Sequence, residues 1–224
     1  MDKVIIIDVE LHRDAVYHFN DFGLLTLSAS DLNRSLVQSE LWQELNRLTT
    51  LLVFPGNGAS IVRTYLDRDW LSIWRWVTVP AQRFWQPGEA PQVRVGRVYP
   101  LGMLLGLRDI VLVDDVASSG KTASVLRKIN EPWIPGARWH ITTWVAQRSL
   151  RLRGFTTRQA SAWVGSDITR APINSLSTLL RYPDVARSFS QRNLGSKADE
   201  FLFFLEELKL EAVGELYENP VLAY

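Results

Sequence analysis

The sequence predicts an α/β domain in which a parallel sheet is flanked by helices. Two apolar segments, Leu51 to Phe54 and Ile110 to Val113, each run into a loop of small residues and then into a helical pattern. Continuous apolar strands are typical of sheets that are buried on both faces, and repeated strand, loop and helix units favour parallel pairing. The 224 residues, 46% of them hydrophobic, suffice for one buried core. We therefore expect a single domain over residues 1–224.

Five elements are predicted, in sequence order, for the first part of the chain. Apolar residues from Val4 to Val9 predict a strand, and leucines at mostly helical spacing from Asp31 to Leu48 predict a helix with Asp31 as its cap. Leu51 to Phe54 predicts the first core strand. Pro55 to Ser60 then predicts a loop, and Ile61 to Leu66 predicts the helix that follows it.

The next segments continue this alternation. Trp74 to Phe84 mixes aromatic and β-branched residues and predicts one strand. The long Pro- and Gly-bearing stretch Gln86 to Gly106 predicts a mobile functional loop. Ile110 to Val113 predicts a buried strand, Ala123 to Asn130 a helix and Trp139 to Ala146 another strand.

The two ends of the chain are expected to be accessory to the core. Phe201 to Leu210 alternates apolar residues with charged ones, which predicts an amphipathic C-terminal helix packed on the domain. We place the core at about residues 49–165. Residues 1–48 and 166–224 are then hood or accessory elements.

Composition excludes several classes of function. The 25 basic residues nearly cancel the 24 acidic ones and no run of like charge occurs, so we expect no nucleic-acid partner and no membrane partner. The absence of cysteine excludes thiolate catalysis and cysteine-ligated zinc. No apolar run is long enough for a membrane span, and the first residues do not resemble a signal peptide. We therefore expect a cytoplasmic protein.

The chemistry concentrates where the strand Ile110 to Val113 ends. Asp114 and Asp115 follow it directly, at the end of the strand where α/β sheets bind ligands. Small residues and hydroxyls in the next loop suit a terminal phosphate, and two carboxylates suit a pair of sugar hydroxyls. A sugar phosphate satisfies both requirements. The loop residues are Ala117, Ser118, Ser119, Gly120, Lys121 and Thr122.

Two other interpretations of this segment are available. Its ending, Gly120-Lys121-Thr122, imitates the phosphate loop of nucleoside triphosphatases, but that loop requires a glycine where Asp115 stands. The segment could also be an ordinary buried strand whose aspartate pair caps the next helix. A run of matching residues as long as Val113 to Thr122 disfavours this second interpretation.

The segment Val113-Asp114-Asp115-Val116-Ala117-Ser118-Ser119-Gly120-Lys121-Thr122 resembles the signature of type I phosphoribosyltransferases, which bind phosphoribosyl pyrophosphate (PRPP). Every constrained position matches. The resemblance implies a Rossmann-like parallel sheet flanked by helices, with a small variable hood. It implies that Asp114 and Asp115 hold the ribose hydroxyls, that Ala117 to Thr122 wraps the 5′-phosphate, and that Mg²⁺ bridges the pyrophosphate and those hydroxyls.

Further roles follow from order and spacing within the same family. Gly56, Asn57 and Gly58 stand where the family places its pyrophosphate loop, and Gln86 to Gly106 where it places its flexible loop. Trp163 is the candidate for stacking on a base, although a core or interface tryptophan is an equally good interpretation. Many members dimerise, so a homodimer is a further expectation.

The resemblance implies transfer of ribose 5-phosphate from PRPP to a nitrogenous base or related acceptor, with release of pyrophosphate. Ser118 and Ala160 depart from the purine-salvage members, which carry an acidic residue and a lysine there. The pyrophosphate loop also lacks a basic residue, although Arg63 is near in sequence. A PRPP- or nucleotide-binding regulator without turnover therefore stays open as the alternative, and the acceptor is undetermined.

Overall fold

The computed structural model describes residues 4–7, 15–84, 92–96, 105–117, 120–146, 155–157 and 173–218. The chain divides into two compact units. One unit comprises Met1–Ala29 together with Arg170–Tyr224, and the other comprises Ser30–Thr169. The second, larger unit contains the segments in which the sequence places the ligand site.

A five-stranded sheet in the order β4-β3-β7-β8-β9 forms the centre of the larger unit. All four pairings within it are parallel. Because parallel neighbours require crossover connections, helices must pass over the faces of such a sheet. The α/β class with a parallel sheet flanked by helices, predicted from the sequence, is confirmed. The strands are β3 (Thr50–Pro55), β4 (Arg75–Val79), β7 (Asp109–Ala117), β8 (Arg138–Ala146) and β9 (Phe155–Thr157).

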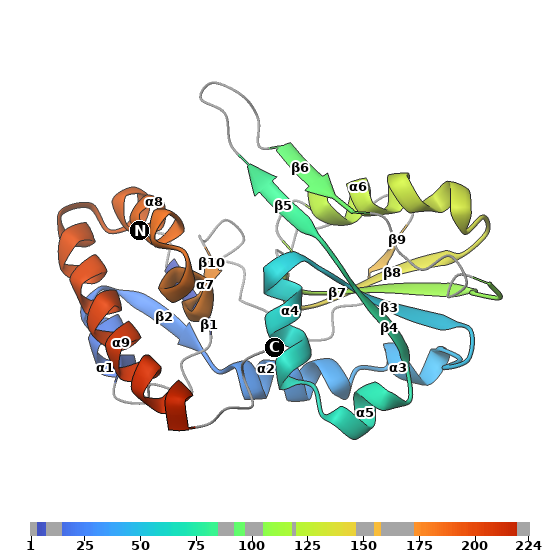
Figure 1. Ribbon diagram of the computed structural model, residues 1–224, viewed down its shortest axis with the longest axis horizontal. Helices are drawn as coiled ribbons and strands as arrows, with labels where there is room; N and C mark the ends of the chain where they lie inside the picture. Colours follow the sequence, from blue (N-terminus) through green and yellow to red (C-terminus); the bar gives the residue numbers. More distant parts are fainter. Residues whose placement is uncertain are drawn as a thin grey trace. The chain divides into compact units, whose positions relative to one another are not determined.

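Helices cover both faces of this sheet (Figure 1). On one face, α6 (Lys121–Asn130) packs the buried Leu126 into a core that includes Ile110 and Trp139. On the other face, the Trp144 indole N–H of β8 donates to the Asn33 side-chain oxygen of α2 (Ala29–Val37) over 3.4 Å. The Tyr65 ring of α4 (Gly56–Tyr65) packs edge-on against Trp144 with 5.4 Å between ring centroids. Burial on both faces explains why the central strands are apolar throughout.

The prediction of a single helix from Asp31 to Leu48 is wrong. The structure has α2, then α3 (Leu41–Glu44), then a turn into β3. Local side-chain bonds replace the helix, since the Ser39 hydroxyl accepts from the Leu41 N–H and the Asn46 side chain accepts from the Leu48 N–H. Asp31 lies inside α2 and pairs with Arg34 at 2.9 Å, so it is not the cap.

The strand predicted from Trp74 to Phe84 is in fact two strands in two sheets. β4 ends at Val79, and β5 (Ala81–Phe84) pairs antiparallel with β6 (Gln92–Val95). Pro80 lies between β4 and β5 and has no N–H for the ladder, while its carbonyl accepts a 2.7 Å bond from the Gly96 N–H at the base of the hairpin. Figure 1 shows this hairpin leaving the parallel sheet.

The hairpin also changes the interpretation of the long predicted loop, Gln86 to Gly106. Residues 92–95 of this stretch form β6. Their side chains alternate between exposed and partly buried, and the strand pairs with β5. Residues 85–91 and 97–104 lie outside the described residues.

Two short elements complete the connections of the larger unit. The helix α5 (Arg68–Ser72), capped by the Asp67 side chain, lies between α4 and β4. The 3-10 turn Glu131–Trp133 leads from α6 toward β8.

The smaller unit has its own parallel sheet, in the order β10-β1-β2. The predicted N-terminal strand is present as β1, and it pairs with β10, which follows it by most of the chain length. Buried aromatic residues such as Phe19, Phe189 and Phe201 form the core against which its helices pack. The elements are β1 (Val4–Ile7), α1 (Ala15–Asp21), β2 (Leu24–Leu27), β10 (Ile173–Ser175), α7 (Leu176–Arg181), α8 (Pro183–Asn193), the 3-10 turn Gly195–Lys197 and α9 (Ala198–Glu218).

The predicted amphipathic C-terminal helix is confirmed as part of α9. Phe201, Leu205 and Leu208 recur at helical spacing and are buried, while Glu206 and Glu207 are exposed. Neither α9 nor any other described helix is both long and apolar enough to cross a membrane. The cytoplasmic location stays a prediction.

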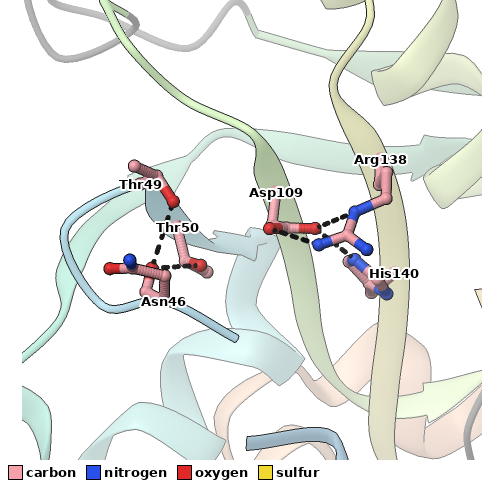
Figure 2. Close-up of polar contacts among 6 residues, drawn as sticks. All are labelled: Asn46, Thr49, Thr50, Asp109, Arg138 and His140. Atoms are coloured by element: carbon pink, nitrogen blue, oxygen red, sulfur yellow. Dashed lines mark hydrogen bonds and ion pairs between the residues drawn. The ribbon is translucent and has the colours of Figure 1, made fainter. Parts of the chain in front are cut away.

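An ionic cluster around the buried Asp109 joins the first residues of β7 and β8 (Figure 2). The Arg138 guanidinium donates to both carboxylate oxygens of Asp109, at 2.8 and 2.9 Å, and His140 Nε2 lies 2.9 Å from one of them. Burial raises the pKa of Asp109, but the hydrogen bonds and positive charge of Arg138 and His140 outweigh burial, so the pKa is lowered overall. The bonds to Asp109 likewise raise the pKa of Arg138. The cluster lies at the amino-terminal edge of the sheet.

Candidate ligand site

The strand order of the parallel sheet locates the candidate site. From β3 the chain passes first to β4 on one side and then to β7 on the other. In open α/β sheets, ligands bind beyond the carboxyl ends of the strands at such a reversal. The β3–β7 pairing ends with Val53 opposite Leu112, whereas β7 stays paired with β8 as far as Ala117 opposite Ala146. Beyond Leu112, β7 is therefore paired with β8 but no longer with β3.

Asp114 and Asp115 lie on this open part of β7. The strand continues through them to Ala117, so it is longer than the Ile110 to Val113 predicted from apolar character. Both side chains are partly exposed, unlike the buried residues that precede them. Asp114 Oδ1 accepts from the Asp115 N–H at 3.0 Å, and Asp115 Oδ1 accepts from the Val116 N–H at 2.7 Å. These backbone bonds orient the two carboxylates.

Gly58 lies directly against the Asp115 carboxylate. An ideal Cβ on Gly58 would come within 2.3 Å of Asp115 Oδ1 and 2.6 Å of Oδ2, which are closer than real Cβ contacts come. Only glycine leaves room for the carboxylate in this position. The structure thus brings the predicted pyrophosphate loop into contact with one of the two predicted ribose-binding residues, although they are distant in sequence.

The two predicted binding loops are largely the first turns of helices. Gly56, Asn57 and Gly58 form the first turn of α4, and Lys121 and Thr122 belong to the first turn of α6. The two residues predicted as the beginnings of these helices, Ile61 and Ala123, are therefore too late in the sequence. First-turn N–H groups have no partner within their own helix, and the helix dipole adds to their attraction for anions.

Gly120 makes the tight entry into α6 possible. It precedes the helix with φ 64° and ψ 14°, in the left-handed region. Residues with a Cβ adopt this conformation at a cost of about 1–2 kcal/mol. The glycine of the predicted motif is thus required by the backbone where a strand that carries two aspartates turns into a helix.

The remaining predicted site residues divide into two groups. Ala117 is buried at the end of β7, Lys121 is exposed and Thr122 is buried in the first turn of α6. The other group lies outside the described residues, so its roles stay predictions; it consists of Ser118, Ser119 and Trp163.

Arg63 does not supply a cation at the first turn of α4. It lies in the last turn, at the other end of the helix from Gly56. Its guanidinium carbon is 5.1 Å from the centroid of the Trp76 ring, a cation–π geometry. Arg94, another arginine of this unit, is exposed on β6.

The β5–β6 hairpin borders the site, which the sequence did not predict. An ideal Cβ on Gly56 would lie 2.7 Å from the Ala81 carbonyl oxygen, so the start of β5 touches the start of α4. Val95 of β6 packs on the core cluster that includes Ala123 of α6. The signal available in the sequence was Pro80, since a proline inside an apparent strand indicates a break.

The donor set at the site suits Mg²⁺ carried by a phosphorylated ligand. Among the described residues, no group of three or more histidine, cysteine, aspartate or glutamate side chains gathers to hold a metal ion. Asp114 and Asp115 nevertheless offer the carboxylate oxygens that Mg²⁺ prefers, and Mg²⁺ is commonly bound by one or two carboxylates together with substrate phosphates. The residues therefore fit Mg²⁺ only in combination with such a substrate.

Fold and site together define an α/β protein with two helix starts and two aspartates at the reversal point of a parallel sheet. No protein-family model matches the chain. No curated protein matches it in sequence.

Several solved structures are similar at low identity. A Helicobacter pylori xanthine-guanine-hypoxanthine phosphoribosyltransferase is 13% identical with a TM-score of 0.45, over 65% of this chain and 86% of that one. A purine phosphoribosyltransferase from Pyrococcus horikoshii is 14% identical with a TM-score of 0.41, over 78% and 93%. A hypothetical protein from Neisseria gonorrhoeae with bound ppGpp is 15% identical with a TM-score of 0.45, over 66% and 82%. These likenesses identify neither a family nor an activity for this chain.

Proposed function

We propose that this chain is a phosphoribosyltransferase that transfers the ribose 5-phosphate group of PRPP to a nitrogenous base or related acceptor and releases pyrophosphate. The contact between Gly58 and Asp115 is the observation that carries the proposal. In PRPP the pyrophosphate is attached to C1, next to the carbon that bears the 2-hydroxyl. A pyrophosphate-binding helix start and a hydroxyl-binding carboxylate must therefore lie side by side, as Gly58 and Asp115 do.

The other end of the ligand fits the start of α6. The 5-phosphate of PRPP is at the opposite end of the ribose from the pyrophosphate. Asp114 and Asp115 precede the α6 first turn by only a few residues, so carboxylates for the hydroxyls and N–H donors for the 5-phosphate come from one continuous segment. The spacing of the binding groups then follows the order of the ligand's own groups, from pyrophosphate to hydroxyls to phosphate.

Transfer requires a nucleophile, usually a ring nitrogen, to form a bond to C1 while the C1–O bond to pyrophosphate breaks. The leaving oxygen keeps the electron pair, so negative charge grows on the pyrophosphate. The N–H groups of the α4 first turn would stabilise that charge by fixed dipoles, and Asp114 and Asp115 would hold the ribose in orientation. Mg²⁺, when bound with the substrate, would add positive charge at the pyrophosphate.

One observation favours a second function, a PRPP- or nucleotide-binding regulator without turnover. Arg63, the basic residue nearest the pyrophosphate loop in sequence, is stacked on Trp76 at the far end of α4. A loop that binds pyrophosphate through N–H groups alone stabilises the leaving group less than a loop that also carries a guanidinium. Such a site would keep affinity for PRPP and lose rate.

The test is calorimetric titration of PRPP with Mg²⁺, followed by assays of pyrophosphate release with purine, pyrimidine and pyridine bases. We expect binding, and release with at least one class of base, which would also identify the acceptor. The double variant Asp114→Asn with Asp115→Asn should lose PRPP binding while its circular dichroism spectrum stays native. Binding without release from any base would favour the regulator, and unchanged affinity in the double variant would overturn the assignment of the site.

A further inference from the structure

The edge of the large sheet opposite the ligand site carries an unusual surface. Before each of the four strands β3, β4, β7 and β8, a large apolar side chain is exposed within the five residues that precede the strand. These residues are Leu48 (81% exposed), Ile73 (41%), Leu105 (77%) and Trp133 (50%). In a parallel sheet all such connections meet at the amino-terminal edge. The four side chains therefore belong to one edge and are not scattered over the surface.

Arginines accompany these apolar residues at the same four entries. Arg47 precedes β3, Arg75 begins β4, Arg108 precedes β7 and Arg138 begins β8. We call these arginines and the four apolar residues the entry edge. Of the four arginines, Arg138 is bound to the buried Asp109, and its side chain is still 65% exposed. The pKa of Arg138 is raised by its hydrogen bonds to Asp109 and by the charge of Asp109, and less by the charge of Glu44.

Hydrogen bonds join the members of the entry edge from strand to strand. The Arg75 guanidinium donates to the Leu48 carbonyl at 3.4 Å. The Arg108 N–H donates to the Thr49 carbonyl at 2.8 Å, and the Arg138 N–H donates to the Arg108 carbonyl at 2.8 Å. Figure 2 shows the entries of β3, β7 and β8 next to one another, with Thr49, Asp109 and Arg138. With neighbouring strands about 4.8 Å apart, the four entries span roughly 14 Å.

A surface of complementary chemistry occurs on α9 of the smaller unit. Phe203 is 67% exposed. The residues three and four positions before and after it are Asp199, Glu200, Glu206 and Glu207, and all four are exposed. Residues at these spacings are surface neighbours on a helix, so four carboxylates surround one exposed ring. Within the described part of the chain, no ion pair involves these four residues.

The two surfaces match in length and in character. From Asp199 to Glu207, α9 rises about 12 Å, close to the roughly 14 Å width of the entry edge. An apolar ring surrounded by carboxylates is complementary to apolar side chains accompanied by arginines. Exposed apolar patches with a polar rim are typical of protein interaction sites.

We propose that a second copy of this chain docks the Phe203 face of its α9 on the entry edge. Phe203 contacts the exposed apolar side chains, and the four carboxylates pair with the arginines. Because every copy carries both surfaces, each copy can present its α9 to a second copy and can receive the α9 of that copy. The occupant is a second copy, since the complementary charges are present on this chain itself.

The test exploits charge reversal on either surface. One variant carries Glu206→Lys and Glu207→Lys, and the other carries Arg47→Glu and Arg108→Glu. Each variant alone replaces two of the four attractive charges on one surface by repulsive ones and is expected to sediment as a monomer. When the two variants are mixed in equal amounts, the lysines on α9 of the first variant meet the glutamates on the entry edge of the second, so the mixture should form a 1:1 dimer. The control Asp184→Lys makes the same type of change on an exposed residue of α8 and should leave the dimer unchanged.

Sedimentation velocity of the full chain over a wide concentration range, at low and at high salt, gives the result. We expect the unmodified chain to be a dimer that dissociates as salt rises, because exposed charge pairs are screened. The proposal is overturned if the unmodified chain is a monomer at every concentration, if either reversed variant dimerises as the unmodified chain does, or if the mixture stays monomeric. None of these outcomes depends on PRPP binding.

Discussion

Replacing Gly58 by alanine tests whether the contact between α4 and β7 positions the ligand. The new Cβ would lie 2.3 Å from Asp115 Oδ1, where ordinary contacts begin at 3.4 Å. The carboxylate must therefore move by about 1 Å, and a misplacement of about 1 Å in an active site costs on the order of 100-fold in rate. Loss of one charge-assisted hydrogen bond to a ribose hydroxyl, worth about 1.5–3 kcal/mol, raises the Kd for PRPP by about 10- to 140-fold.

Although its affinity for PRPP falls, the Gly58→Ala variant should be as stable to unfolding as the unmodified chain, or slightly more stable. Alanine is favoured over glycine within a helix by about 0.5–1 kcal/mol, and Gly58 lies in the first turn of α4. Asp115 is partly exposed, so its carboxylate can move without creating a buried cavity. We expect weaker PRPP binding together with an unchanged or slightly higher Tm.

Calorimetric titration with PRPP and Mg²⁺, paired with thermal unfolding, measures both effects. Thr64→Ala is the matched control, because Thr64 is exposed on the same helix and its hydroxyl bonds only to the Ile61 carbonyl among the bonds described, at 2.7 Å. The control should bind PRPP as the unmodified chain does. Unchanged affinity in a folded Gly58→Ala variant would refute the argument that Asp115 must occupy its present position to hold the ribose.

Three further predictions concern stability and are measured by urea denaturation. Because the pKa of Asp109 is lowered in the folded chain, its contribution is full above the ordinary value of about 3.9 and disappears as pH falls through the lower folded value. Asp109→Asn should thus cost about 1–3 kcal/mol at pH 7, with a difference that shrinks below about pH 4; a constant difference would contradict this. Gly120→Ala should cost about 1–2 kcal/mol because φ is positive, and Gly120→Asn should cost less, since asparagine tolerates this region; equal losses would argue against backbone strain. Leu126→Ala, at a fully buried site, should cost about 2–5 kcal/mol, and exposed Lys128→Ala no more than about 0.5 kcal/mol; similar losses would show that α6 does not pack as described.

Much of the larger unit could be predicted because its signals are local. The apolar run that becomes β3 and the run from Trp139 to Ala146 that becomes β8 are buried on both faces, so their composition alone identifies them. Errors arose where local and distant interactions compete. Asp31 to Leu48 has helical spacing, but the Ser39 and Asn46 side chains bond to the backbone and end the helices early.

The β5–β6 hairpin shows a different kind of limit. Trp74 to Phe84 has strand-forming residues throughout, so composition could not separate β4 from β5. The separation depends on partners, because β4 pairs with β3 and β5 pairs with β6. Pairing partners are distant in sequence, and a pattern of residue types does not specify them.

For the candidate site, the sequence by itself determined the chemistry of one segment. An apolar strand, two aspartates, small residues and Gly120 dictate carboxylates followed by a tight turn into a helix, because each step depends on neighbouring residues. Only the tertiary structure decided that Gly58 lies against Asp115. That contact depends on the strand order, which places β3 beside β7, and strand order is set by the packing of whole elements and not by any short run of residues.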